Sequence, residues 1–183
     1  MSAYGEAKLE QEELATRILG NTVPVIVGRL SNLYGPGQNL VKAQGLVSLL
    51  CLAAATRRAL NLFVPLDTLR DYLYVDDAAV MIVSLLMATL RSQPQTLVIR
   101  NLASERPVPV AGIVRVVQQV ARRPVRVGLA TSPTSGDQPR DLRVVSCAPR
   151  DLARAPITPL PVGVKRIYEH TLEILRDQPY TWP

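Results

Sequence analysis

The sequence is poor in the side chains that build zinc sites, disulfide frameworks and base-stacking surfaces. It contains two cysteines, one histidine and 4% aromatic residues among its 183 positions. Cys51 and Cys147 lie far apart and lack the paired spacing of zinc ligands, and one histidine is too few to complete a site with them. We therefore predict a cytoplasmic protein with reduced thiols and no bound metal. The low aromatic content also argues against a surface on which nucleic-acid bases stack.

Long apolar segments are also missing. The first residues do not show a basic segment followed by the apolar run of a secretory signal. The longest apolar stretches, residues 46–55 and 78–90, are broken by polar residues or too short to span a bilayer. We therefore expect no membrane partner.

A third absence concerns glycine. No Gly-x-Gly-x-x-Gly or Gly-x-x-Gly-x-x-Gly motif follows an apolar run anywhere in the chain. Gly35-Pro36-Gly37 predicts a turn, but its proline lacks the amide donor that a phosphate group needs. The sequence thus lacks the loop that binds dinucleotide phosphates in Rossmann folds.

The composition that is present is that of a globular protein, with 48% hydrophobic and 20% charged residues. The net charge of +6 indicates either an acidic partner, such as a phosphate ligand or nucleic acid, or simply an arginine-rich composition. The positive charge is dispersed apart from the short pairs Arg57-Arg58 and Arg122-Arg123. Because no basic face or recognition motif is evident, we predict no nucleic-acid partner.

Segments of helical periodicity alternate with short apolar runs, which predicts an α/β fold. The apolar run at 23–27 is typical of a strand buried on both faces of a parallel sheet. Asp76 stands where it can cap the helix that follows it. The predicted helices are 2–18, 44–60, 77–90, 110–121 and 162–175, the predicted strands are 23–27, 62–64, 70–75, 96–101 and 125–129, and the predicted loops include 30–39.

Tyr4 and Lys8 lie four residues apart in the first predicted helix and therefore share a face. A lysine ammonium near a phenol favours the phenolate form. A phenolate can take a proton from a substrate hydroxyl while hydride leaves the same carbon. The spacing also arises by chance in many helices, so the pair alone does not establish this chemistry.

Three segments in this order carry a family resemblance: YGEAK at residues 4–8, VIVGRLSNLYGPGQ at 25–38 and LRDYLYVDDAA at 69–79. They resemble the C-terminal part of extended short-chain dehydrogenases/reductases, in particular the NAD-dependent epimerase/dehydratase group that acts on nucleotide sugars. The resemblance implies a partial Rossmann-like parallel sheet plus a small α/β substrate-binding lobe. Residues 1–60 would supply the catalytic helix, the buried strand and the next loop and helix, and residues 61–183 mostly the lobe.

The resemblance also implies roles for four residues. Tyr4 matches the general acid/base, and Lys8 matches the lysine that tunes it and holds the nicotinamide ribose of NAD or NADP. Asn32 and Arg70 match residues that contact the diphosphate of the nucleotide sugar, and a guanidinium suits phosphate oxygens. The alternatives are that Asn32 caps its own backbone and that Arg70 pairs with Asp71. Tyr34, Tyr72 and Tyr74 are interpreted as packing residues.

The sequence departs from the family pattern at several points. Besides the missing glycine motif, the Ser or Thr that assists the tyrosine in the family is not found. That residue lies upstream of the tyrosine, and Ser2 is too close to Tyr4 to be its counterpart. The arginine often found before Gly-Asp is absent at residues 134–137, where Arg140 or Arg143 are candidate substitutes. Residues 152–159 lack the usual aromatic motif.

These observations predict the C-terminal portion of an NAD(P)-dependent nucleotide-sugar epimerase or dehydratase that is inactive alone. Its ligand would be a nucleoside-diphosphate sugar, and its partner an N-terminal half or a second copy of the chain. The alternative is a non-catalytic, nucleotide-sugar-binding or partner-dependent module. A basic nucleic-acid binder is a weaker third hypothesis.

Overall fold

The computed structural model describes residues 3–40, 45–131, 139–145 and 157–177. Helices and parallel strand pairs alternate along the chain, which confirms the predicted α/β class. The helices are α1 (Ala3–Leu19), α2 (Leu46–Thr56), α3 (Val75–Thr89), α4 (Val110–Ala121) and α5 (Leu160–Asp177). The strands are β1 (Val25–Leu30), β2 (Asn32–Tyr34), β3 (Leu60–Leu62), β4 (Leu69–Arg70), β5 (Tyr72–Tyr74), β6 (Leu97–Leu102), β7 (Val108–Pro109), β8 (Val127–Leu129) and β9 (Asp141–Leu142).

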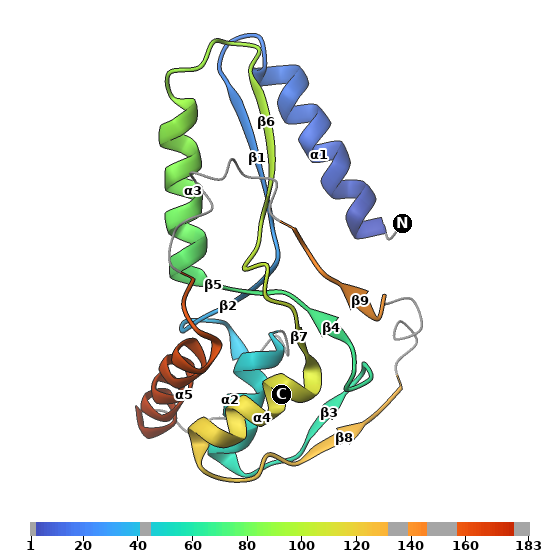
Figure 1. Ribbon diagram of the computed structural model, residues 1–183, viewed down its shortest axis with the longest axis vertical. Coiled ribbons are helices and arrows are strands. Elements are labelled where there is room, and N and C mark those ends of the chain that lie inside the picture. Colours follow the sequence, from blue (N-terminus) through green and yellow to red (C-terminus); the bar gives the residue numbers. More distant parts are fainter. Residues whose placement is uncertain (1–2, 41–44, 132–138, 146–156, 178–183) are drawn as a thin grey trace.

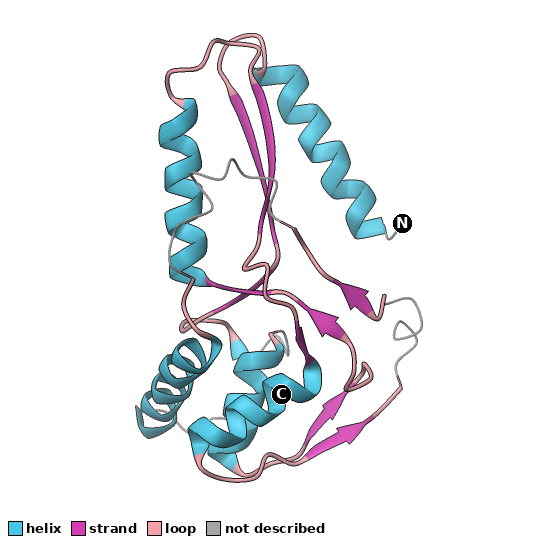
Figure 2. Cartoon of the chain, viewed as in Figure 1, coloured by secondary structure: helices cyan, strands magenta, loops and turns pink. Residues whose placement is uncertain are grey.

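The molecule has two bodies, and the long strands belong to the upper one (Figures 1 and 2). There β1 and β6 run parallel, in register from Val25 opposite Leu97 to Leu30 opposite Leu102. Helices α1 and α3 both contact β1 and lie on either side of the strand pair (Figure 1). We call this part, α1, β1, α3 and β6, the strand body.

The prediction of a strand buried on both faces is wrong for β1 within the part of the chain that the structure describes. Only Val25 of this strand is buried, and Leu30 is 41% exposed. The reason is that β1 has β6 as its one strand neighbour among the described residues, and that α1 buries none of its own side chains. Burial on both faces needs further elements packed on the sheet.

The larger hydrophobic core lies in the lower body, where α2, α4 and α5 pack together beside β3 and β8. Helix α2 is apolar almost throughout and sits in the middle of this core. Helix α4 instead buries one face, as its 3.6-residue periodicity predicts. We call this part the helix body; its fully buried side chains include Leu50, Cys51, Val110, Ile113, Val117 and Val164.

Short strands connect the two bodies. The pair β2 and β5 is parallel, and β4 pairs with β7 and β9. The chain runs from the strand body to α2 and β3, returns to α3 and β6, and then leaves again for α4 (Figure 1). The two bodies therefore do not correspond to residues 1–60 and 61–183. Helix α2 packs against α4 and α5, whereas α3 and β6 pack against β1.

The predicted capping role of Asp76 is also wrong. Helix α3 begins two residues earlier than predicted, at Val75, with Tyr74 at the cap position and no side-chain hydrogen bond there. Asp76 is exposed and lies 3.8 Å from the Arg166 guanidinium of α5. The next residue, Asp77, is buried and accepts hydrogen bonds from the Thr158 amide (2.7 Å) and hydroxyl (2.8 Å). These contacts tie the start of α3 to the segment that leads into α5.

Candidate functional site

A pocket of about 760 Å³ lies where β2 and β5 approach the beginning of α2. Tyr4, Asn32 and Arg70 all line it, so the structure brings three of the four predicted site residues together. They come from α1, β2 and β4, which are far apart in the sequence. Other lining side chains include Ser31, Tyr34, Gln38, Leu46, Tyr72 and Val110.

Asn32 is held to the neighbouring strand segment. Its backbone amide and its side-chain Nδ2 both donate to the Asp71 carbonyl, at 3.3 and 2.8 Å. The side chain therefore bonds across the strand pair instead of capping its own backbone. Asn32 remains exposed, so its side chain is accessible from the pocket.

Arg70 is buried in β4. It lies opposite Val108 of β7 and Leu142 of β9 in the sheet. Its Nη1 donates to the Leu69 carbonyl at 2.8 Å. Burial lowers the pKa of this guanidinium, while the neighbouring Tyr72 and Asp141 act in the opposite direction. A cation that has lost part of its hydration binds an anion more strongly than one in open solvent.

Asp71 organises this region, and the sequence did not identify it as more than a partner for Arg70. Its carboxylate is fully buried and accepts hydrogen bonds from the hydroxyls of Ser31 (2.6 Å) and Ser104 (2.8 Å). The backbone amides of Ser104 (2.9 Å) and Arg106 (3.1 Å) also donate to it. Its side chain thus fixes the end of β1 and the segment after β6, and its carbonyl fixes Asn32.

Tyr4 and Lys8 share a face of α1, as their spacing predicts. The Lys8 Nζ lies 5.7 Å from the centroid of the Tyr4 ring and donates to Gln11 Oε1 at 2.9 Å. Tyr4 is 74% exposed, and Lys8 is exposed as well. Tyr4 lines the pocket, whereas Lys8, about one helical turn from Tyr4, is not among the lining residues.

Three tyrosines pack together at this site, and two of them, Tyr34 and Tyr72, line the pocket. The Tyr34 ring meets those of Tyr72 and Tyr74 edge-on, with centroids 6.4 and 5.5 Å apart. Burial raises the pKa of Tyr72 to about 12. Burial, together with Asp77 and Tyr74, also raises the pKa of Tyr34. Phenols with such high pKa values stay protonated at neutral pH, which agrees with a packing role.

The two arginines considered as substitutes for the missing family arginine are both in exposed ion pairs. Arg140 lies 3.5 Å from Asp67, and Arg143 lies 2.8 Å from Asp141. Neither lines the pocket. Residues 134–137 and most of residues 152–159 lie outside the described residues.

Over the described residues, no group of three or more His, Cys, Asp or Glu side chains is arranged to hold a metal ion. In the same part of the chain, the helices are too short or too polar to cross a lipid bilayer.

The model of the NAD dependent epimerase/dehydratase family matches residues 1–103. The chain belongs to this family. It is 32% identical over 118 residues to dTDP-L-rhamnose 4-epimerase of Burkholderia thailandensis, a match that covers 63% of the chain and 31% of that enzyme. It is 30% identical over 105 residues to UDP-glucuronate 4-epimerase 4 of Arabidopsis thaliana, covering 53% of the chain and 24% of the enzyme. The matches thus span about a third or less of the length of these curated relatives.

Solved structures share the fold. UDP-glucuronic acid 4-epimerase from Bacillus cereus, in complex with UDP-glucuronic acid and NAD, superposes with a TM-score of 0.77 at 18% identity. The match covers 94% of this chain and 53% of that one. MoeE5 in complex with UDP-glucose and NAD gives a TM-score of 0.75 at 22% identity, over 95% and 56% of the two chains. The Rossmann-like α/β architecture inferred from the sequence is confirmed.

The family implies NAD, and the described residues fit only one end of that molecule. The Tyr4 hydroxyl and the Lys8 ammonium offer donors on one exposed face of α1, which suits a ribose. The pyrophosphate needs a glycine-rich turn that opens a helix. The described turns before α2, α3, α4 and α5 do not have the Gly-x-x-Gly-x-x-Gly spacing. These residues therefore do not make a complete dinucleotide site.

Proposed function

We propose that the chain is the C-terminal portion of an NAD(P)-dependent nucleotide-sugar epimerase or dehydratase. The observation that carries the proposal is that Tyr4, Asn32 and Arg70 line one pocket of about 760 Å³. The chain belongs to a family of NAD-dependent epimerases and dehydratases. This pocket joins a phenol to two groups that bind phosphate oxygens. The ligand is a nucleoside-diphosphate sugar.

In this function Arg70 and Asn32 hold the diphosphate, through a charged guanidinium and a neutral amide donor. The β2 and β4 strands fix both side chains before the ligand arrives, which reduces the entropy lost on binding. Tyr4 exchanges a proton with a sugar hydroxyl, and Lys8 favours the phenolate that does so. NAD or NADP, when bound, supplies the hydride acceptor.

Because the described residues fit only the ribose end of the cofactor, the chain alone is proposed to be inactive with free NAD or NADP. Its partner is then an N-terminal half that supplies the rest of the cofactor site, or a second copy of the chain that covers exposed apolar surface. Translating the DNA upstream of the Met1 codon tests the first possibility. An in-frame strand followed by Gly-x-x-Gly-x-x-Gly supports it, and turnover of UDP-glucose by the purified chain with NAD contradicts it.

A second candidate is a nucleotide-sugar-binding or partner-dependent module without catalysis. The observation in its favour is that Asn32 and Arg70 donate hydrogen bonds to the carbonyls of Asp71 and Leu69, which are not part of the helix that carries Tyr4 and Lys8. The binding groups are thus positioned independently of the acid/base pair. This candidate predicts that the Tyr4→Phe variant keeps the full function of the chain.

Calorimetric titration of the purified chain with UDP-glucose and UDP-glucuronic acid tests the shared binding step. We expect saturable binding without NAD, weakened about tenfold or more by Arg70→Ala. Arg91→Ala, which removes an exposed arginine beyond the end of α3, is the matched control and should bind as the wild type does. No binding by the folded wild type, or equal weakening by both variants, would refute the proposal.

A further inference from the structure

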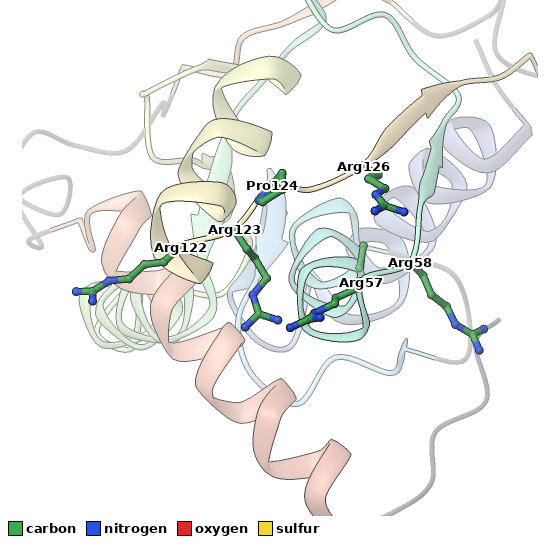
Figure 3. Close-up of a pocket in the computed structure, with 7 residues that line it drawn as sticks. Arg57, Arg58, Arg122, Arg123, Pro124 and Arg126 are labelled. Atoms are coloured by element: carbon green, nitrogen blue, oxygen red, sulfur yellow. The ribbon is translucent and has the colours of Figure 1, made fainter.

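The helix body carries a second pocket, of about 350 Å³, whose lining is dominated by arginine (Figure 3). The two arginine pairs noted in the sequence meet there, because the end of α2 lies beside the end of α4. Arg126, just before β8, adds a fifth guanidinium. The complete lining is Ala53, Arg57, Arg58, Arg122, Arg123, Pro124 and Arg126.

The pocket has no carboxylate among its lining residues. Within the described part of the chain, no carboxylate forms an ion pair with Arg57, Arg122, Arg123 or Arg126. Figure 3 shows the guanidinium groups of Arg57 and Arg123 pointing toward one another. Like charges that converge without a counter-charge raise the energy of the folded state, and an anion between them removes that cost.

Helix stability explains only part of this arrangement. Arginine near the end of a helix interacts favourably with the helix dipole, and Arg123 Nη1 reaches the Ala54 carbonyl of α2 at 3.5 Å. However, Arg57 and Arg122 occupy the left-handed cap positions of α2 and α4, with φ of 59° and 52°. Glycine is the residue that this conformation favours. Arginine at both positions carries a conformational cost that a helix cap alone does not require.

We propose that this pocket binds a small, multiply charged phosphate anion, such as pyrophosphate or the polyphosphate of a nucleotide. Planar guanidinium groups bind phosphate oxygens in pairs, and those of Arg57 and Arg123 converge at a pocket that holds a group of this size and that three further arginines line. The lining residues include no aromatic side chain, so bases are not stacked there. This favours a small anion over a single-stranded nucleic acid, which proteins bind by stacking its bases.

The arginine pocket is separate from the nucleotide-sugar pocket. The two share no lining residue. Leu46 and Val47 at the beginning of α2 line the nucleotide-sugar pocket, whereas Ala53 and Arg57 at its end line the arginine pocket. An 11-residue helix is about 16 Å long, so one small ligand does not occupy both sites.

The test is calorimetric titration of the whole chain with pyrophosphate at fixed salt concentration. The test variant is Arg57→Gly with Arg123→Gln, since glycine suits the backbone at position 57. The charge-matched control is Arg17→Gln with Arg91→Gln, both exposed and outside the arginine pocket. We expect saturable binding by the wild type and the control, and about tenfold or more weaker binding by the test variant.

Several results would overturn the proposal. One is no binding of pyrophosphate by the folded wild type, and another is equal weakening in the test and control variants, which indicates an effect of overall charge. Loss of pyrophosphate binding on Arg70→Ala, with the test variant unaffected, assigns the anion to the nucleotide-sugar pocket. Binding of a DNA duplex that depends on Arg57 and Arg123, without binding of pyrophosphate, makes the pocket a nucleic-acid contact instead.

Discussion

The hydroxyl of Ser31 donates a hydrogen bond of 2.6 Å to the carboxylate of Asp71, a residue 40 positions later in the chain. Ser31 stands between β1 and β2, and Asp71 stands between β4 and β5. One buried carboxylate therefore joins the end of the strand body to the strands that carry Asn32 and Arg70. The geometry of the candidate nucleotide-sugar pocket depends on this contact.

Replacing Asp71 by Ala should strongly destabilise the chain. The change leaves the hydroxyls of Ser31 and Ser104 and the amide of Ser104 without their buried acceptor. We expect the free energy of unfolding in urea to fall by about 3 kcal/mol. Asp67→Ala is the control, because that carboxylate is exposed and pairs with exposed Arg140. It should change stability by less than about 1 kcal/mol; similar losses in both variants would contradict the role of Asp71.

The ion pair between Glu12 and Arg29 makes stability depend on pH. Two hydrogen bonds from Arg29, at 3.0 and 2.6 Å, lower the pKa of Glu12 in the folded chain from its ordinary value of 4.5. A lowered folded pKa means that the contribution is fully present above pH 4.5 and is lost as the pH falls through the folded value. Glu12→Gln should therefore lower the Tm at pH 7, and the difference should vanish in strongly acidic solution. A difference in Tm that stays constant with pH would refute this prediction.

Cys51 should resist thiol reagents in the folded chain. It is fully buried, and burial raises its pKa to about 12, so the reactive thiolate is scarce at neutral pH. Because Cys147 lies outside the described residues, the measurement uses the Cys147→Ser variant. Its remaining thiol should react with Ellman's reagent only as the chain unfolds, and rapidly in urea. Fast reaction in buffer would show that the core around α2 opens readily.

Gly163→Ala should destabilise the chain even though alanine favours helices. A Cβ at this position of α5 would lie 2.7 Å from both Cε2 and Oη of Tyr34, a buried ring that lines the pocket. We expect a loss of about 1–3 kcal/mol in the free energy of unfolding, measured in urea. Lys165→Ala, at an exposed position of the same helix, serves as the control and should be nearly neutral. A stabilised Gly163→Ala variant would show that α5 does not pack closely on Tyr34.

The chain should self-associate at micromolar concentration. Helix α3 exposes an apolar surface in which Val80, Val83 and Met87 are 51%, 56% and 62% exposed. Exposed apolar surface of this kind favours association. Size-exclusion chromatography with light-scattering detection should show species larger than a monomer. The double variant Val83→Glu with Met87→Glu should shift the population toward the monomer. A wild type that is monomeric at all concentrations would refute the prediction.

The regular helices could be predicted from the sequence because their signals are local. The apolar positions of α4, and the Tyr4 and Lys8 pair on one face of α1, follow directly from a 3.6-residue period. Likewise, the parallel strands β6 and β8 lie close to the apolar runs that predicted them. The three family segments placed Tyr4, Asn32 and Arg70, which the fold then brought to one pocket.

The features that depend on distant partners could not be predicted. Residues 70–75 were expected to form one strand, but β4 and β5 separate at Asp71, because β4 pairs with β7 and β9 while β5 pairs with β2. Strand β2 lies inside the predicted loop at 30–39 and was not predicted, because it forms by pairing with β5, which is distant in the sequence. The two arginine pairs were visible in the sequence, but only the packing of α2 on α4 shows that they face one pocket.

The repeated passage of the chain between its two bodies has a consequence for any attempt to divide it. A fragment that ends at residue 60 contains β1 without its partner β6, and α2 without α4 and α5. Neither body survives in such a fragment, because each draws its elements from both sides of the cut. A protease that nicks one of the connecting segments therefore yields two pieces that are both incomplete, and only their reassociation restores either core.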